Sequence, residues 1–410
     1  MSWIHRLLGR KSGALTLTSL PDYLLGPASK SGVNVTWSTA LEVSTMLACC
    51  KVMGEGIAQS RCRLMRPRKN GAGLEAAADH PLYRLLYRRP NNWQSAFEFW
   101  ETLLFHLMLV GNAYVFVNRV GSGRIHELVI IEPSRVVVTQ MEDYSLVYDV
   151  TGIDHVTRRF PASMIWHIRG ASWNGWMGME SVRLAREALG LSIALEAAHA
   201  AVHKNGAQPT GIYSIEGSLS DQQHKQLTEW LKKHAAQEKG SPLILDRAAK
   251  WVSQQMTGVD AEHVATRRLQ IEEVCRAARV IPLMVGQSDK TATYASVEQL
   301  LVAHVVHGLA PWASRLEQSG EAALLTEQED AQGYELTFNL AALMRGDYKS
   351  RQEGLQIMRR NGIVNANEWR EQENMNPRED PGGAQYIVEA NMQIQDGRDL
   401  TGAPAAPTGA

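Results

Sequence analysis

The stretch that decides the fold is residues 260–301, DAEHVATRRLQIEEVCRAARVIPLMVGQSDKTATYASVEQLL. In its first half, apolar residues recur at intervals of three, four and seven, which predicts an amphipathic helix; they are Val264, Ile271, Val274, Ala278 and Ile281. Arg268, Glu272 and Arg276 follow one another at i,i+4, so we expect ion pairs along this helix. The first half therefore predicts a long, ion-paired rod.

The middle of the stretch predicts a hinge. Pro282 should end the first rod, because its ring excludes a backbone hydrogen bond four residues back. After Leu283–Val285 comes a polar tract that favours turns: Gly286, Gln287, Ser288, Asp289, Lys290 and Thr291. A second helix should restart near Ala295 and run toward Pro311. No catalytic or ligand chemistry is present in this stretch, so we expect a mechanical role for it.

Length and charge limit the possible functions. The chain has 410 residues, of which 44% are hydrophobic, and this predicts two or three soluble domains. Lys plus Arg (42) nearly cancel Asp plus Glu (43), which leaves a net charge of −1. Proteins that grip phosphates tightly are usually basic, so any contact with nucleic acid should be weak.

Cysteine usage indicates a reduced compartment, and the apolar runs are too short for a membrane span. Cys49, Cys50, Cys62 and Cys275 show neither CxxC spacing nor a disulfide framework, and reduced, cytosolic folding is expected. No run reaches the length of about 18 apolar residues that a membrane span requires. Residues 1–35 predict a flexible arm. Its basic amphipathic start, residues 3–11, leaves docking to a partner or membrane surface as an alternative.

The rest of the chain alternates between helical and strand patterns, which predicts an α+β fold. Helices are expected on residues 43–57, between Pro81 and Pro90, and from a capping box of Ser95 and Glu98 to Gly111 as the residue that ends the helix. Strands are expected at 114–117, 128–131, 136–139, 146–150, 165–168 and 334–338. A helix is expected on 181–204, and two helices separated by Gly362, the second capped by Asn365 or Asn367, on 347–373.

A compact insert is predicted between two long helices. It should contain a strand at 211–215, a helix opened by a capping box of Ser220 and Gln223 and carrying Trp230, and further strands near 243–245 and 251–253. This pattern is typical of a small domain at the end of a helical hairpin.

Motifs for nucleotide or metal chemistry are absent or incomplete. No GxxxxGK[ST], GxSxG or HExxH motif occurs. His199 and His203 lie at i,i+4 without a third ligand at recognisable spacing, as do His304 and His307 at i,i+3, so no metal site and no cofactor are expected. Two polar groups are expected to face solvent. They are the basic patch of Arg61, Arg63, Arg66, Arg68 and Lys69 on a strand, and Glu327, Glu329 and Asp330 in a loop. For the basic patch, a nucleic-acid site is the alternative.

Several segments resemble one family in the same order along about 340 residues. They are VSTMLACCKVMGEGIA (43–58), the HPLYRLL, RPN, QSAFEFWE and GNAY elements of residues 80–119, NGAQPTGIYS (205–214), IPLMVGQSDKTATYASVEQ (281–299) and NGIVNANEWR (361–370). With these segments the chain resembles the portal proteins of tailed double-stranded DNA bacteriophages, the long-tailed phage and prophage type. The tract before Thr293 is longer and more charged than a minimal pattern of that family.

The resemblance implies a non-enzymatic ring, usually of about twelve copies, at one capsid vertex of the virion. Double-stranded DNA would pass through it when packaged, retained and ejected. The implied partners are further copies of the chain, the terminase large subunit, a head-tail adaptor, and the major capsid and scaffold proteins. Assembly would occur in the cytoplasm of a bacterial host, without a membrane.

The resemblance also implies a division of the chain into the parts of the portal fold. Residues 36–188 would form an α+β wing, 189–207 and 261–281 two stem helices around a clip at 208–260, 282–294 a tunnel loop, 295–342 a long wing helix and strand, 343–394 a helical crown, and 395–410 a disordered tail. Pro282 would be the hinge, residues 286–291 would face the DNA, and Arg268, Glu272 and Arg276 would lie on the stem. Contacts with terminase or adaptor would fall to Gln223, Trp230, Lys232 and Lys233.

Two other functions are considered. One is a different ring-shaped head-tail connector that meets DNA only after packaging. The other is a metal-dependent hydrolase that uses His199 and His203. The length of the two rods favours a portal over a small adaptor, and the missing third ligand disfavours the hydrolase.

Overall fold

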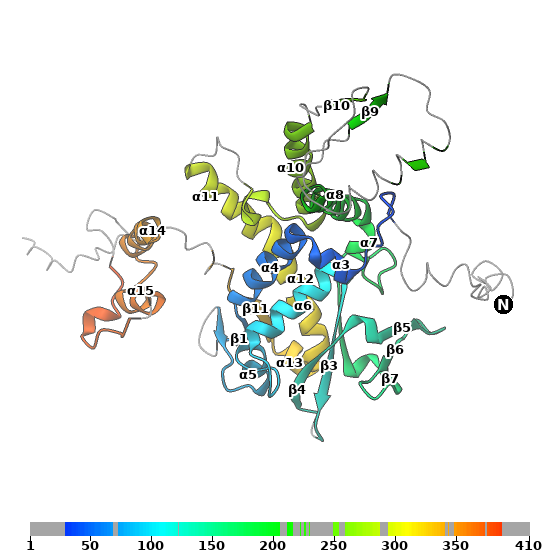
Figure 1. Ribbon diagram of the computed structural model, residues 1–410. Helices are drawn as coiled ribbons and strands as arrows, with labels where there is room; N and C mark the ends of the chain where they lie inside the picture. Colours follow the sequence, from blue (N-terminus) through cyan, green and yellow to red (C-terminus); the bar gives the residue numbers. More distant parts are fainter. Residues whose placement is uncertain are drawn as a thin grey trace, which may run out of the picture. The chain divides into compact units, whose positions relative to one another are not determined.

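The computed structural model describes residues 29–387, except 69–72, 122, 206–210, 216–221, 223–224, 227–228, 230–248, 254–258, 288–293, 341–342, 344–347 and 374. For residues 201–205, 211–215, 249–253, 259–264, 294–298, 348–351 and 371 it describes the backbone alone. The chain forms two compact units, residues 1–340 and 341–410. The expected α+β fold is confirmed (Figure 1).

A pair of helices forms the centre of the first unit. α3 (Trp37–Glu42) leads into α4 (Ser44–Gln59), which packs along α6 (Ala96–Val110). α6 begins at the predicted capping box, in which Ser95 and Glu98 each accept a hydrogen bond from the other's backbone N–H. It ends at Gly111, whose φ of 75° is left-handed, as the sequence predicts.

Three small antiparallel sheets surround this helix pair. The first has the order β4 (Ile125–Ile131), β3 (Asn112–Arg119), β8 (Ile165–Arg169), and the second β5 (Val136–Gln140), β6 (Leu146–Thr151), β7 (Thr157–Pro161). The third has the order β11 (Glu335–Phe338), β1 (Cys62–Pro67), β2 (Leu74–Ala76). α5 (Pro81–Tyr87) lies against β1, and the 3-10 turns η1 (Pro133–Arg135) and η2 (Ala162–Met164) lead into β5 and β8.

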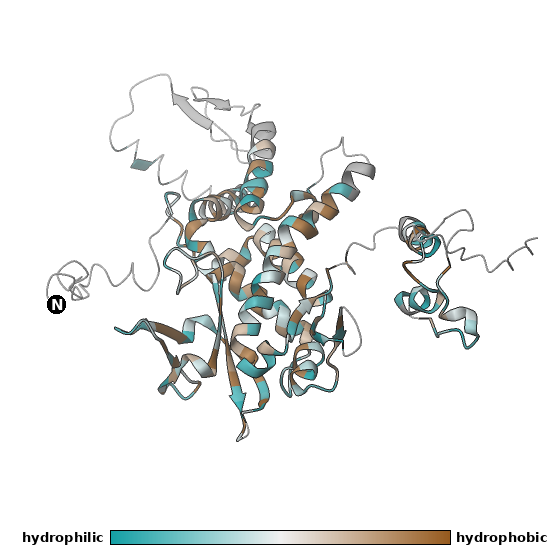
Figure 2. Cartoon of the chain, turned by 180° about the vertical axis from the view of Figure 1, so that it is seen from behind, coloured by the Kyte–Doolittle hydropathy of each residue, from teal (hydrophilic) through white to brown (hydrophobic). Residues whose placement is uncertain are grey.

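The core lies where α6, α12 (Ala310–Leu324) and the sheets meet. Trp100 makes edge-on ring contacts with Trp166 on β8 and Phe338 on β11, at centroid distances of 6.0 and 4.9 Å. Glu317 and Glu321 of α12 accept the backbone N–H groups of Phe338 and Leu336 at 2.7 and 2.9 Å. These two carboxylates therefore pair β11 donors that the ladder to β1 leaves free. In Figure 2 the apolar colour gathers where these elements face one another.

Of the two polar groups predicted to face solvent, the acidic one is placed differently. β1 alternates as predicted, with Cys62 and Leu64 buried. Glu327, Glu329 and Asp330 lie in the short helix α13 (Glu327–Ala331) and not in a loop, because Thr326 and Glu329 form a capping box. Glu329 also accepts a hydrogen bond from His80 at 2.7 Å, so the prediction of a merely solvated carboxylate was wrong.

The long helices follow. After α7 (Ser181–Leu184), α8 (Arg186–Asn205) and α10 (Val259–Ala278) pack against each other. Between them in sequence, β9 (Gly211–Ile215) and β10 (Ala249–Ser253) pair antiparallel, at two of the strands predicted for the insert. The predicted strand at 243–245 and capping box of Ser220 and Gln223 lie outside the described residues. No helix among the described residues is long and apolar enough to cross a membrane.

The second unit contains α14 (Tyr348–Arg360), α15 (Ala366–Gln372) and a 3-10 turn η6 (Pro381–Gly383). Of the two predicted caps of α15, Asn365 is the correct one, because its Oδ1 accepts the Glu368 N–H at 2.8 Å. The Glu368 carboxylate in turn accepts a hydrogen bond from the Asn365 N–H at 2.8 Å. Gly362 separates the helices with a left-handed φ of 69°.

Candidate functional site

The C-terminus of α10 is closed by a backbone motif that the sequence did not reveal. Arg279 has a φ of 55°, and its N–H donates to Arg276 O at 3.2 Å while the Val280 N–H donates to Cys275 O at 2.9 Å. This pair of bonds is the Schellman arrangement, which ends a helix at a left-handed residue. α10 therefore ends at Ala278 and does not continue to Ile281. Pro282 is not the residue that stops the rod.

Pro282 instead begins the hinge as a tight 3-10 turn, η3 (Pro282–Val285). The Met284 N–H donates to Ile281 O at 2.9 Å, and Gly286 closes the turn with a left-handed φ of 86°. The Gln287 N–H donates back to Pro282 O at 3.0 Å. These bonds fix the direction in which the chain leaves the turn. Of the predicted tract, Gly286 and Gln287 are described, whereas Ser288, Asp289, Lys290 and Thr291 lie outside the described residues.

The second rod is one helix with a wide turn inside it. α11 (Tyr294–Ala303) passes through a π segment, η4 (His304–Leu309), into α12 without a break. Pro311 lies at the start of α12, directly after the π segment. The rod continues through Pro311 and does not end there. Single π turns often occur at functional positions in helices.

A close approach to α4 accompanies the π segment. A Cβ built on Gly56 of α4 would lie 2.9 Å from both Cδ atoms of Leu309, so the absence of a side chain at Gly56 leaves room for Leu309. His304 is buried beside this contact, and its Nδ1 has no hydrogen-bond partner among the described residues. Burial lowers the pKa of His304, which keeps the imidazole neutral.

The foot of α10 is also seated on α4. Val274 and Cys275 are buried, and the Cys275 Sγ lies 4.0 Å from the Cys49 Sγ. η3 contacts the same helix. α4 therefore contacts the end of α10, the hinge turn η3 and the π segment η4.

The charged residues predicted for the stem lie on the exposed side of α10, but their pairing differs from the prediction. Arg276 pairs with Glu273, three residues earlier, and not with Glu272. Among the described residues no ion pair joins Glu272 to Arg268 or Arg276. Glu272 and Arg268 are exposed, so these two charges remain available on the outer face of the rod.

The residues predicted for metal binding and for the clip are only partly described. His199 lies on α8, and the side chain of His203 lies outside the described part of the helix. Across the described residues, no three His, Cys, Asp or Glu side chains are placed to hold a metal ion together. His304 is buried and His307 is exposed, so the two do not share one site. Gln223, Trp230, Lys232 and Lys233 lie outside the described residues.

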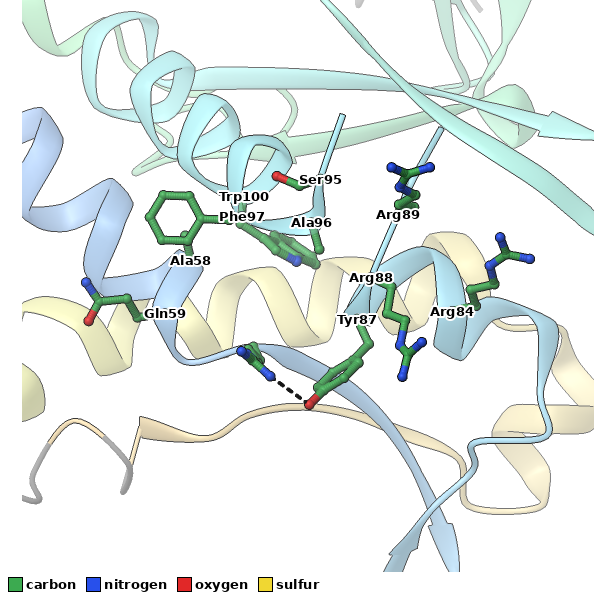
Figure 3. Close-up of a pocket in the computed structure, with 11 residues that line it drawn as sticks. Ala58, Gln59, Arg84, Tyr87, Arg88, Arg89, Ser95, Ala96, Phe97 and Trp100 are labelled. Atoms are coloured by element: carbon green, nitrogen blue, oxygen red, sulfur yellow. Dashed lines mark hydrogen bonds between the residues drawn. The ribbon is translucent and has the colours of Figure 1, made fainter. Parts of the chain in front are cut away.

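A second candidate site was missed by sequence reasoning. Arg61, Arg84, Arg88 and Arg89 line one cavity of about 790 Å³, where α4 and α5 end and α6 begins (Figure 3). Only Arg61 belongs to the basic patch seen in the sequence. The signal that could have revealed the others is the RRP run at 88–90, which brings two arginines to the end of α5.

The chain was compared with known proteins. A family model described as "Phage portal protein" matches residues 44–374. The portal protein of Enterobacteria phage HK97 is 28% identical over 402 residues, which cover 94% of this chain and 93% of that protein. The probable portal protein of Streptomyces phage phiC31 is 26% identical over 384 residues, which cover 90% of this chain and 82% of that protein.

Solved structures share the fold. One is a chain from the neck of an empty gene transfer agent (GTA) particle, with a TM-score of 0.55, 22% identity, and coverage of 82% of this chain and 90% of that one. Another is the crystal structure of an HK97 family phage portal protein from Corynebacterium diphtheriae, with a TM-score of 0.54, 15% identity, and coverage of 77% and 99%. At these identities the likeness establishes the fold alone.

Proposed function

Because this chain belongs to the phage portal protein family, we propose that it forms a closed ring at one capsid vertex, through which double-stranded DNA is packaged, retained and ejected. The observation that carries the proposal is the hinge. A 3-10 turn, Pro282–Val285, joins two rods, and the turn, α10 and the π segment of the second rod all contact α4. In a ring, the tips that follow Gln287 would converge on the axis.

The number of copies is proposed to be about twelve. A chain in the neck of a native gene transfer agent particle, described with C12 symmetry, matches this fold with a TM-score of 0.54 and covers 88% of the chain. A ring needs two different surfaces on each copy, because only a head-to-tail contact can close around an axis of this order.

The charge of the chain suits a passive conduit. With a net charge of −1, the ring would neutralise few phosphates, and each phosphate contact avoided lowers affinity and drag on moving DNA. We propose no catalytic step for the chain itself. The energy for packaging would come from a separate terminase motor.

We propose further partners from the position of each part. The insert at 208–260, with Gln223, Trp230, Lys232 and Lys233, would meet the terminase large subunit during packaging and a head-tail adaptor afterwards. The outer surface of residues 36–188 would contact the major capsid and scaffold proteins. Assembly would take place in the cytoplasm of the bacterial host, before the particle is released.

Electron microscopy of the purified protein tests the proposal. Negatively stained images should show rings with a central channel, and native mass spectrometry should give a mass near twelve times that of the 45.5 kDa chain. A stable monomer at micromolar concentration in several buffers would contradict a portal function.

A further inference from the structure

The cavity lined by Arg61, Arg84, Arg88 and Arg89, here called the arginine pocket, carries positive charges that no neighbouring carboxylate among the described residues balances. Across the residues that the structure describes, the only hydrogen bond from its four guanidinium groups goes from Arg61 Nη1 to the Tyr87 hydroxyl at 3.0 Å. Within the described parts of the chain, none of the four pairs with a carboxylate. Arg84, Arg88 and Arg89 are exposed at the mouth of the cavity (Figure 3). The pocket is therefore prepared for an anionic ligand.

A fifth arginine behind Tyr87 adds to this excess. The Arg63 guanidinium carbon lies 5.7 Å from the centroid of the Tyr87 ring, and that of Arg61 lies 5.5 Å from it. The Arg63 Nε is buried without a hydrogen-bond partner among the described residues. The hydrogen bond from Arg61, with the charges of Arg61 and Arg63, lowers the pKa of Tyr87. A bound anion would offset the positive charge of these arginines.

The floor of the pocket indicates which kind of anion fits. It is made of aromatic and small apolar side chains, Phe97 and Trp100 with Ala58 and Ala96. Phe97 is 40% exposed, an unusual value for a large apolar side chain at the mouth of a cavity. A DNA backbone offers phosphates but no apolar group for this floor. An acidic peptide with an aromatic residue satisfies both the rim and the floor.

The chain itself presents such a peptide at another place. The turn between β5 and β6 carries Met141, Glu142, Asp143 and Tyr144, and Tyr144 is 80% exposed. Asp143 Oδ1 accepts hydrogen bonds from the Ser145 N–H and Oγ at 3.0 and 2.6 Å, which hold the shape of the turn. Figures 1 and 2 place this turn and α5 at opposite ends of the first unit, so the two surfaces are suited to meet between copies.

Both surfaces contain a side chain on strained backbone. Tyr144 has a φ of 67° and Arg61 a φ of 49°, in the left-handed region that glycine adopts without cost. A non-glycine residue in that region costs energy that the surrounding structure must offset. Here one strained residue lies on the tip and the other in the pocket.

We propose that the β5–β6 turn of one copy docks into the arginine pocket of the next copy around the ring. Tyr144 would lie on the exposed Phe97, while Glu142 and Asp143 would meet Arg84, Arg88 and Arg89. The two surfaces differ and lie apart on one chain, so the contact is head-to-tail and closes a ring. This inference rests on the ring proposed above and names the contact that builds it.

The first test removes the aromatic anchor without harming the fold. Tyr144→Gly relieves the left-handed strain, so the melting temperature of the unassembled chain should not fall. The protein concentration at which half of the copies are in rings should rise roughly tenfold or more, measured by native mass spectrometry over a dilution series. His155→Gly is the matched control, because His155 has a φ of 58° at the neighbouring β6–β7 turn. It should leave ring formation unchanged.

The second test reverses charges on the two surfaces. Glu142→Arg and Arg88→Glu should each weaken ring formation roughly tenfold, and the double variant, with both signs exchanged, should recover much of it. Arg124→Glu, an exposed arginine outside the pocket, should have no effect. Rings that form equally well in all variants would overturn the proposal while leaving the portal function intact.

A DNA site in the pocket is the competing result. If rings of Arg88→Glu form normally but bind a labelled DNA duplex more weakly at low salt, the pocket holds phosphates and the docking proposal is wrong. If the unaltered chain forms no rings at all, the proposed function fails together with this contact.

Discussion

The Sγ atoms of Cys275 on α10 and Cys49 on α4 lie 4.0 Å apart in the interior of the first unit. Both side chains are fully buried, so this contact marks the place where the long rod is seated on the central helix pair. The hinge begins just beyond it, at Pro282. A rod held at its foot can project a tip without moving the core.

We expect the four thiols to be unreactive in the folded protein. All four cysteines are buried, which shields their thiols from reagents. Burial raises the pKa of Cys50 to about 12 and also raises that of Cys62, and contact with the Cys275 thiol together with burial raises the pKa of Cys49, whereas the same contact lowers the pKa of Cys275. Because the thiolate is the reactive form, labelling by Ellman's reagent at pH 8 should be roughly 100-fold slower than in the unfolded chain. Ser134→Cys places a thiol at an exposed position and should react at once. Fast labelling of Cys275 would show that α10 is not seated on α4.

Replacing Arg279 by glycine should stabilise the end of α10. The left-handed φ of 55° is unfavourable for arginine and free for glycine. After allowing for the greater freedom of glycine in the unfolded chain, we expect the free energy of unfolding to rise by roughly 0.5–1 kcal/mol.

Ala265→Gly, at an exposed position in the interior of the same helix, is the matched control. It should lower the free energy of unfolding by roughly 1 kcal/mol, because glycine disfavours helix interiors. Urea unfolding curves at one protein concentration measure both changes. Equal destabilisation by the two variants would contradict the observed helix end.

Stability should fall as the pH drops from about neutral, because several histidines, among them His167, His106 and His304, have pKa values lowered by burial and stay neutral in the fold. His167 donates from Nε2 to Asn112 Oδ1 at 3.0 Å and accepts from the Tyr148 hydroxyl at Nδ1 at 3.3 Å. Burial lowers its pKa from 6.5 to about 3, and burial lowers that of His106 to about 4. Below pH 6.5 the unfolded chain therefore binds protons that the folded chain does not.

The free energy of unfolding should fall with a slope of up to about 1.4 kcal/mol per pH unit for each histidine. The loss begins as the pH falls through 6.5 and continues to about 4 for His106 and about 3 for His167. Urea unfolding at pH 7.5, 6 and 5 measures it. His106→Gln should reduce the slope between pH 6 and 5 by up to about 1.4 kcal/mol per pH unit; an unchanged slope would show that His106 is not a source of the dependence.

Local signals in the sequence predict the elements well where the chemistry is local. The capping box of Ser95 and Glu98 and the left-handed Gly111 follow from residue type alone, and both are confirmed. The strand pattern at 157–161 was missed, because Thr157, Arg158 and Arg159 are exposed on β7 and offer no alternation. Asp149 pairs with Arg159 across the ladder, a contact that appears only when the strands meet.

The hinge shows where sequence reasoning is insufficient. A proline was expected to stop α10, but the stop is Arg279, a residue type with no preference for left-handed backbone. The arginine pocket was missed for a similar reason. Arg61 and Arg88 come from different elements, and only the packing of α5 against β1 brings them to one cavity.

The central claim is that the hinge places its tip in a DNA channel, and deletion of residues 287–291 tests it most directly. Among the described residues of the tract, Gln287 takes no part in the buried core, so we expect rings and empty heads still to form. Full-length genome packaging or retention should fall. Lys290→Ala keeps the length of the tract and removes one positive charge, and it should leave folding and rings unchanged. For each variant, rings are counted by electron microscopy and DNA-filled heads by density gradient. The account predicts normal rings with few filled heads after the deletion; normal filling of heads would contradict it.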